Sequence, residues 1–108
     1  MATIISNDLD FQQNITQNPL VIVKYHADWC GNCRLISPKY KNLSEDPQNS
    51  SVIFLEVNAE ENPIARKAAG VTNLPFFATF SKGQLLKGID TSRIETVQEL
   101  ITEVIKSV

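Results

Sequence analysis

The sequence predicts an α/β fold in which helices cover both faces of a mixed β-sheet. Apolar runs typical of strands alternate with helix-like segments, and two late strand-like runs flank a hairpin pattern at residues 81–84. The alternation implies parallel strands, and the hairpin adds an antiparallel part. A length of 108 residues suits one domain, which we expect to span residues 1–108.

The first half of the chain alternates between strand and helix. A short apolar strand is expected at 3–5, then a helix at 8–16 that Asn7 caps and whose first turn holds Asp8. The run 20–25 is apolar except for Lys24 and predicts a strand buried on both faces. A helix up to about residue 44 follows, with Leu35 on its apolar stripe and Pro38 expected to kink it. Residues 45–51 form a polar loop, and 52–57 form a second buried strand.

The second half continues the alternation and ends in a helix. Asn62 and Pro63 begin a short helix with an apolar stripe that includes Ile64, and Gly70 ends it. Strands are expected at 76–80 and 85–89. Residues 92–95 match a capping box. The helix after it carries an apolar stripe made of Ile94, Val97, Leu100, Ile101, Val104, Ile105 and Val108.

Composition excludes several functional classes. The 10 basic and 12 acidic residues give a net charge of −2 without a basic cluster, so we expect no nucleic-acid partner. No apolar run approaches a membrane span, and the start lacks secretory-signal features, so we expect a cytoplasmic protein without a membrane partner. Two cysteines and one histidine are too few for a structural zinc site, and we expect neither metal nor cofactor.

Cys30 and Cys33 lie where the first buried strand meets the next helix. Free N–H groups at a helix N-terminus favour an anion, so the Cys30 thiolate is the expected nucleophile. Cys33, one turn inside, is expected to resolve the mixed disulfide. Gly31 is expected to allow a tight turn, and Trp29 to form an apolar platform. The alternatives are two cysteines that only pack, or a metal or iron–sulfur carrier that bridges two chains.

The chain resembles the thioredoxin family over its whole length. The resemblance rests on residues 27–33 with their Trp-Cys-Gly-Asn-Cys run, and on Pro38, Asn62-Pro63, Gly70-Val71, Leu74-Pro75 and Lys82-Gly83. It implies a thioredoxin fold, with a four- or five-stranded mixed sheet flanked by four helices. It also implies a monomeric oxidoreductase that reduces protein disulfides and receives electrons from a thioredoxin-reductase-type donor.

By this resemblance Pro75 is the cis-proline that faces the cysteines, and the exposed backbone of Leu74 pairs with an extended substrate. Together with Trp29, Gly31 and Asn32 these residues form the expected substrate-binding set. The alternative for Pro75 is an ordinary trans loop proline.

Three departures from the family pattern affect the chemistry. Asn32 stands where proline is usual, and we expect its N–H and amide to stabilise the Cys30 thiolate and make the protein less reducing. Lys24 stands where the family has a buried aspartate, and Glu56 where many members carry a lysine. Lys24 is a candidate catalytic group, as a base or as a cation near Cys33; the alternatives are a structural ion pair or an ammonium that snorkels to solvent. His26 replaces a tryptophan, and we expect a partly exposed ring under the active-site loop rather than a ligand.

Two smaller departures concern the expected groove. Phe76 follows Pro75 where threonine is common, and a late glycine of the family aligns with Thr91. The leading function is thiol–disulfide exchange. A non-catalytic binding module and a less reducing, isomerase-like variant are the alternatives.

Overall fold

The computed structural model describes residues 3–107 and contains a five-stranded mixed sheet. The strands are β1 (Ile4–Ile5), β2 (Leu20–His26), β3 (Ile53–Asn58), β4 (Phe76–Ser81) and β5 (Gln84–Asp90), in the spatial order β1-β3-β2-β4-β5. β1 and β2 each run parallel to β3, whereas β4 is antiparallel to both β2 and β5. The predicted mixed sheet is confirmed, with β2 at its centre.

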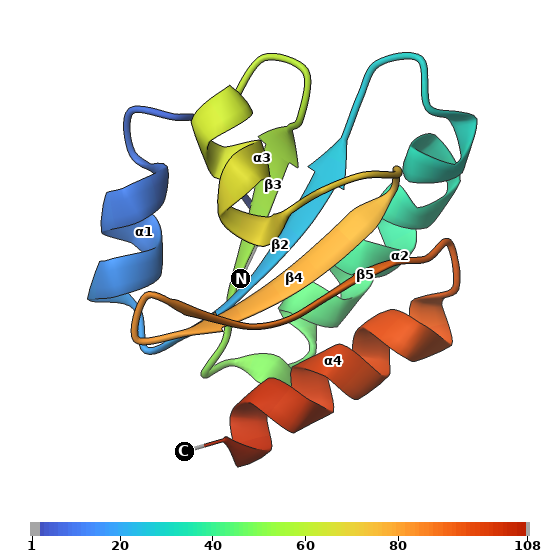
Figure 1. Cartoon of the computed structure of the whole chain (residues 1–108). Helices are drawn as coiled ribbons and strands as arrows, with labels where there is room; N and C mark the ends of the chain where they lie inside the picture. Colours follow the sequence, from blue (N-terminus) through green and yellow to red (C-terminus); the bar gives the residue numbers. More distant parts are fainter. Residues whose placement is uncertain (1–2, 108) are drawn as a thin grey trace.

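Four helices cover the sheet, two on each face (Figure 1). They are α1 (Phe11–Gln17), α2 (Gly31–Glu45), α3 (Pro63–Ala69) and α4 (Ile94–Lys106). α1 and α3 lie on one face, and α2 and α4 on the other. A short 3₁₀ turn, η1 (Pro47–Asn49), lies in the predicted loop. None of the helices in the described chain is both long and apolar enough to cross a membrane.

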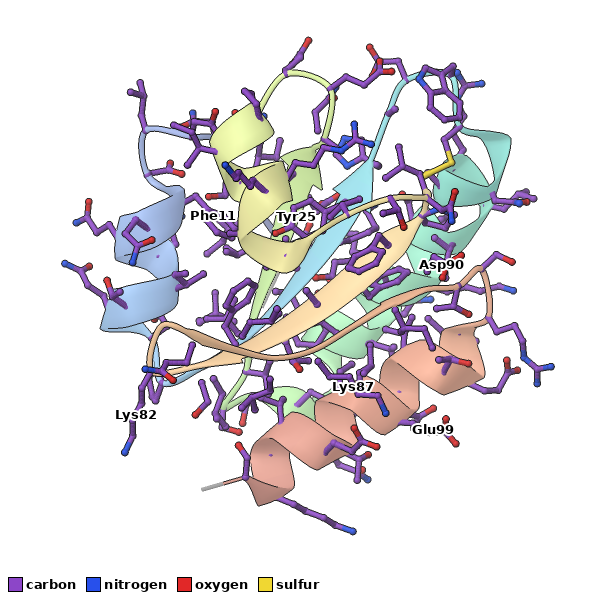
Figure 2. The ribbon with its side chains drawn as sticks, viewed as in Figure 1. Phe11, Tyr25, Lys82, Lys87, Asp90 and Glu99 are labelled. Carbon is purple, nitrogen blue, oxygen red and sulfur yellow. A yellow bond between two sulfur atoms is a disulfide. The ribbon has the colours of Figure 1, made fainter. Side chains whose placement is uncertain are left out.

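Side chains of β2 alternate between two cores because successive residues of a strand point to opposite faces. Val21, Val23 and Tyr25 enter the core under α1 and α3, where the Tyr25 hydroxyl donates to the Ala65 carbonyl of α3 at 2.8 Å (Figure 2). Leu20 and Ile22 enter the opposite core, under α2 and α4. The same alternation places Lys24 and His26 on the α2 side, beneath the helix that carries the cysteines.

Two predicted helix starts differ in detail. α1 begins at Phe11 because residues 8–10 form a turn in which the Asn7 side chain accepts the N–H of Leu9 at 3.0 Å. At α4 the predicted capping box is wrong. Arg93 occupies the N-cap without a side-chain cap, and its N–H donates to the Thr91 hydroxyl at 3.1 Å.

Asp8 caps a helix other than the one expected. Its carboxylate accepts the N–H groups of Ile64 and Ala65 at 3.1 and 2.8 Å, in the first turn of α3. Asn62, predicted as the cap of α3, holds the N-cap position but makes no capping bond; its side-chain oxygen accepts the N–H of Asp8 at 2.9 Å. The N-terminal segment and α3 are therefore clasped by reciprocal hydrogen bonds.

Some apolar residues lie outside the cores that the sequence predicts. Leu35 is 73% exposed and Ile64 67% exposed, although both have helical spacing with buried neighbours. β1 is an exposed edge strand, and Ile5 is 81% exposed. The hairpin is confirmed, with Lys82 and Gly83 at φ 52° and 82°. Val108 of the predicted α4 stripe lies outside the described residues.

Loss of the Asp8 cap should destabilise the protein. We expect Asp8→Ala to lower the free energy of unfolding by about 1–2 kcal/mol, since two N–H groups of α3 lose their acceptor. Chemical denaturation measures the change. Asp8→Asn keeps one side-chain acceptor and should lose less unfolding free energy. An Asp8→Ala variant as stable as the parent would contradict the reciprocal hydrogen bonds.

Candidate active site

The two cysteines form a disulfide at the start of α2, seen as the yellow bond in Figure 2. Cys30 is the N-cap of α2, and its Sγ accepts the N–H of Cys33 at 3.1 Å. The exposed fractions are 4% for Cys30 and 2% for Cys33, so burial does not distinguish them. Their positions on the helix do, because the Cys30 sulfur lies at the end where N–H groups and the helix dipole favour a thiolate.

The residues next to Cys30 differ in how the structure holds them. Trp29 is 66% exposed, as expected for a platform, and its indole N–H donates to the Glu60 carboxylate at 2.6 Å. The expectation that Gly31 is needed for a tight turn is wrong. The backbone of Gly31 is not in the left-handed region, and a Cβ built there meets no atom within 4 Å. The chain turns instead at Asp28 and Trp29, where the Cys30 N–H donates to the Ala27 carbonyl at 3.1 Å; Cys30 itself is extended before the helix begins.

The Leu74–Pro75 peptide bond is cis, as the resemblance implies. Pro75 is buried, and its carbonyl accepts the N–H of Thr91 at 3.1 Å. A groove of about 380 Å³ lies beside this loop. Its lining residues are Asn32, Leu74, Pro75, Asp90, Thr91, Ser92 and Arg93.

Three predicted binding residues, Asn32, Leu74 and Pro75, thus share one groove, whose described lining does not include Trp29 or Gly31. Sequence reasoning missed two charged residues that line the groove, Asp90 and Arg93. Their only signal was a place between the last strand and the last helix.

Lys24 and Glu56 meet in an ion pair of 2.9 Å. They are direct partners in the register of β2 with β3, which explains the contact. Lys24 is 2% exposed, and its ammonium also donates to the Ser37 hydroxyl and lies 5.6 Å from the centre of the Tyr40 ring. The snorkelling alternative is therefore wrong, because the ammonium is buried and paired.

The hydrogen bonds around this pair continue in two directions. Ser37 donates from its hydroxyl to the Cys33 carbonyl at 2.8 Å, so Lys24 connects to the backbone of the inner cysteine. The second oxygen of Glu56 accepts the hydroxyl of Thr3. One continuous chain of hydrogen bonds thus joins the N-terminal segment to the active-site helix.

Charges and burial shift the pKa values of two groups here. Burial opposes ionisation of Glu56, but hydrogen bonds from Thr3 and Lys24 outweigh it and hold the pKa of that carboxyl below its ordinary 4.5. Burial, and then the charge of Lys24, lower the pKa of the half-buried His26 below its ordinary 6.5. Nearby carboxylates oppose this second shift without cancelling it. His26 is therefore neutral and Glu56 charged near pH 7.

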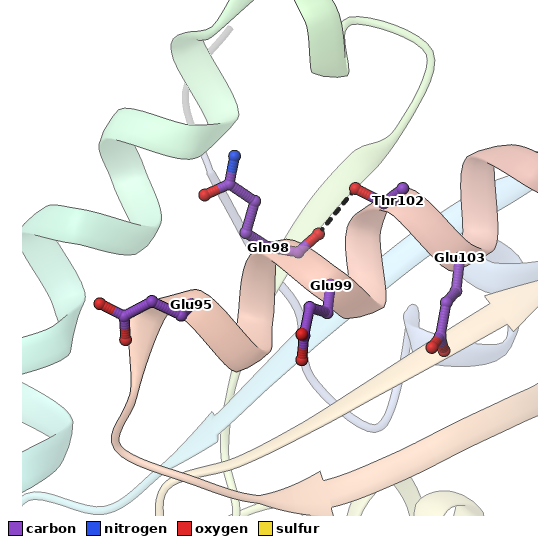
Figure 3. A pocket seen from close by; sticks show the side chains of 5 residues that line it. All are labelled: Glu95, Gln98, Glu99, Thr102 and Glu103. Atoms are coloured by element: carbon purple, nitrogen blue, oxygen red, sulfur yellow. Dashed lines mark hydrogen bonds between the residues drawn. The ribbon is translucent and has the colours of Figure 1, made fainter.

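A surface hollow of about 540 Å³ lies along α4, and its lining includes neither cysteine (Figure 3). Its lining is Glu95, Gln98, Glu99, Thr102 and Glu103, an exposed and mostly acidic helix face. Within this lining Figure 3 shows the Thr102 hydroxyl donating to the Gln98 carbonyl. Such a face is typical of a solvated helix, and we assign no site to it.

The disulfide joins two cysteines three residues apart at the N-terminus of a helix, and the same protein carries a groove beside a cis-proline. These features define a thiol–disulfide oxidoreductase. The protein is of this class. A profile of the thioredoxin family matches residues 2–106. The chain belongs to the thioredoxin family, as the sequence resemblance indicated.

Relatives and solved structures agree with this assignment. Human thioredoxin is 35% identical over 107 residues, which cover 97% of this chain and 100% of the relative. Mitochondrial thioredoxin-2 of Schizosaccharomyces pombe is 33% identical over 94 residues, covering 87% of this chain and 69% of the relative. The thioredoxin structure from Fasciola hepatica superposes with a TM-score of 0.85 at 27% identity and covers 94% and 99% of the two chains. The predicted thioredoxin fold is confirmed.

Removing the carboxylate of Glu56 should destabilise the protein, because the buried Lys24 ammonium loses its counter-charge. We expect Glu56→Gln to cost about 2–3 kcal/mol, below the full value for a buried pair because Glu56 is partly exposed. Lowering the pH should act in the same way. With a folded pKa below 4.5, the contribution of Glu56 is complete above the unfolded value and is lost as pH falls through the folded one.

Denaturation of parent and variant across the acid range measures this effect. The two stability curves should converge toward low pH, where the parent carboxyl is protonated as well. A constant difference at every pH would show that the charge of Glu56 is not what stabilises the pair.

Proposed function

We propose that this protein reduces disulfides of other proteins, with Cys30 as the attacking nucleophile and Cys33 as the resolving thiol. The observation that carries the proposal is the position of Cys30 at the α2 N-cap, where its sulfur already accepts a backbone N–H. The Cys30 thiolate attacks a substrate disulfide and forms a mixed disulfide. Cys33 then attacks Cys30, which closes the intramolecular disulfide and releases the reduced substrate.

Substrate binding is proposed at the groove beside the cis-proline. The cis bond supports pairing of an extended substrate segment with the Leu74 backbone, next to Asn32 and Pro75. Trp29 and Gly31, the two sequence neighbours of Cys30, complete the proposed set. Thr91, which aligns with the late glycine of the family, lines this groove together with Arg93, so we expect a narrower choice of partners.

We place Lys24 in the reaction as a cation. Its ammonium is held by Glu56 and Ser37, which supports a cationic role rather than that of a neutral base. The positive charge would favour the thiolate form of Cys33. The electron donor is proposed to be of the thioredoxin-reductase type. We further propose that residues 1–108 act as one domain and a monomer; the predicted cytoplasmic location remains a prediction, and one relative is named as mitochondrial.

The redox potential of the Cys30–Cys33 couple tests the proposal, by equilibration in defined thiol–disulfide buffers. A reversible two-electron couple near about −270 mV would support a general reductant. A value of about −200 mV or above would indicate a specialised reductant or an isomerase. Absence of a reversible couple would overturn the proposal in favour of a binding module.

The division of labour between the cysteines predicts a difference between two serine variants. Cys33→Ser should accumulate mixed disulfides with protein substrates through Cys30, because nothing resolves them. Cys30→Ser, the matched control, should accumulate few. Non-reducing electrophoresis after incubation with an oxidised model substrate measures both; equal trapping by the two variants would contradict the assignment.

Asn32 predicts a shift in potential. Asn32→Pro removes an N–H from the first turn of α2 and an amide from the groove, so we expect a more negative potential by about 30 mV, or 1.4 kcal/mol. The N–H that contacts Cys30 in the oxidised structure belongs to Cys33, which limits the expected size. An unchanged potential would remove Asn32 from the residues that tune the couple.

A further inference from the structure

Cys33 must lose a proton before it can attack Cys30, since the thiolate is the nucleophile. Lys24 is a poor acceptor for that proton because Glu56 and Ser37 hold its ammonium. The acceptor has to be an unprotonated base near Cys33. Two such groups, His26 and Asp28, line a cavity together with Cys33; Asp28 is exposed, whereas one ring nitrogen of His26 is buried.

His26 and Cys33 line the same cavity, which has a volume of about 280 Å³. His26 is the last residue of β2, and Cys33 lies in the first turn of α2. The remaining lining residues are Ala27, Asp28, Arg34 and Ser37. Asp28 and Arg34 are exposed, so the cavity leads from the buried cysteine toward solvent.

Nδ1 of His26 is buried and has no hydrogen-bond partner, the one such side-chain atom in the described residues. An unpaired buried polar atom is destabilising, so its presence calls for an explanation. The donor available to it depends on the oxidation state of Cys33. In the disulfide, Cys33 has no hydrogen to donate. Reduction places an S–H donor on a residue of the same cavity.

We propose that Nδ1 of His26 accepts the proton of the Cys33 thiol when Cys33 attacks the mixed disulfide. This inference rests on the proposed function and adds a catalytic residue to it. The imidazole takes the proton as the Cys33 sulfur bonds to the Cys30 sulfur. The bond between Cys30 and the substrate sulfur breaks at the same time, and its electron pair leaves on the substrate thiolate. The protein dithiol is thereby oxidised by two electrons, and the substrate disulfide is reduced to two thiols.

The charges around His26 suit this role. Lys24 on β2 and Arg34 on α2 are positive, whereas Glu56 on β3, Asp28 before α2 and Glu61 before α3 are negative. Burial and Lys24 prevail and lower the pKa of His26, so the imidazole is neutral and ready to accept at pH 7. The resulting imidazolium lies near Lys24, which favours passing its proton to solvent through the cavity.

The first test is NMR of the imidazole nitrogens in the isotope-labelled protein. The chain has a single histidine, so the signals need no assignment. We expect Nδ1 to be the unprotonated nitrogen in the oxidised protein and its resonance to move upfield on reduction, as a hydrogen bond from Cys33 forms. The Cys33→Ala variant under reducing conditions should keep the oxidised-like resonance. An identical Nδ1 resonance in both redox states would overturn the proposal.

The second test is the rate at which a mixed disulfide on Cys30 closes, measured against pH. We expect His26→Gln to slow closure about 100-fold near pH 7 and to remove the inflection that His26 contributes. Free imidazole should restore closure in His26→Ala, a response that a merely structural residue would not give. The matched control is attack by Cys30 in a Cys33→Ser background, whose rate should not depend on His26.

The outcomes separate the two proposals. A parent protein without a reversible couple would overturn the proposed function. A parent that cycles normally, with a His26→Gln variant of unchanged rate and pH profile, would overturn the role of His26 alone. Circular dichroism of each variant verifies that the fold is retained.

Discussion

The buried charge of Lys24 is the constraint on which the active-site end of this fold depends. An ammonium that is 2% exposed requires a counter-charge, and the register of β2 with β3 supplies one from Glu56. The same ammonium contacts Ser37 and so reaches the backbone of Cys33. It also helps to keep His26 neutral. The resemblance to the family implies an aspartate at the Lys24 position and a lysine at the Glu56 position, whereas in this chain the positive member of the pair lies on the central strand. A cation beneath the cysteines favours a thiolate, whereas a buried aspartate there would accept a proton.

Much of this structure could be predicted from residue order. The apolar runs of β2 and β3 and the Lys82-Gly83 turn each have a local cause, and the fold confirms them. Asp8 shows where such reasoning ends. Its place near a helix start is local information, but the α3 N–H groups that it binds lie more than fifty residues away. The predicted burial of Leu35 and Ile64 is wrong for a related reason. Periodicity identifies an apolar stripe, but it does not show how much of that stripe a neighbouring element covers.

The site divides in the same way. The cysteine spacing and its position between a strand and a helix are visible in the sequence, as is the candidate cis-proline. The contact between Lys24 and Glu56 was not visible in the sequence, since strand register depends on the whole sheet. Ser37 carries no signal of its own among the polar residues of α2. The orphan nitrogen of His26 is a property of three-dimensional packing alone. The two cysteines and the cis-proline are thus predictable from the sequence, whereas the contacts around Lys24 and His26 depend on the folded structure.

The hydroxyl of Thr3 bonds to the carboxylate that neutralises Lys24, and β1 holds this segment at the sheet edge by only two paired residues. A fusion tag or protease site placed just before Thr3 therefore lies one side chain away from the charge pair beneath the cysteines. Recombinant proteins that differ only at this end are therefore expected to differ in the redox potential of the Cys30–Cys33 couple. Measurements that compare such samples are best made on chains with identical starts.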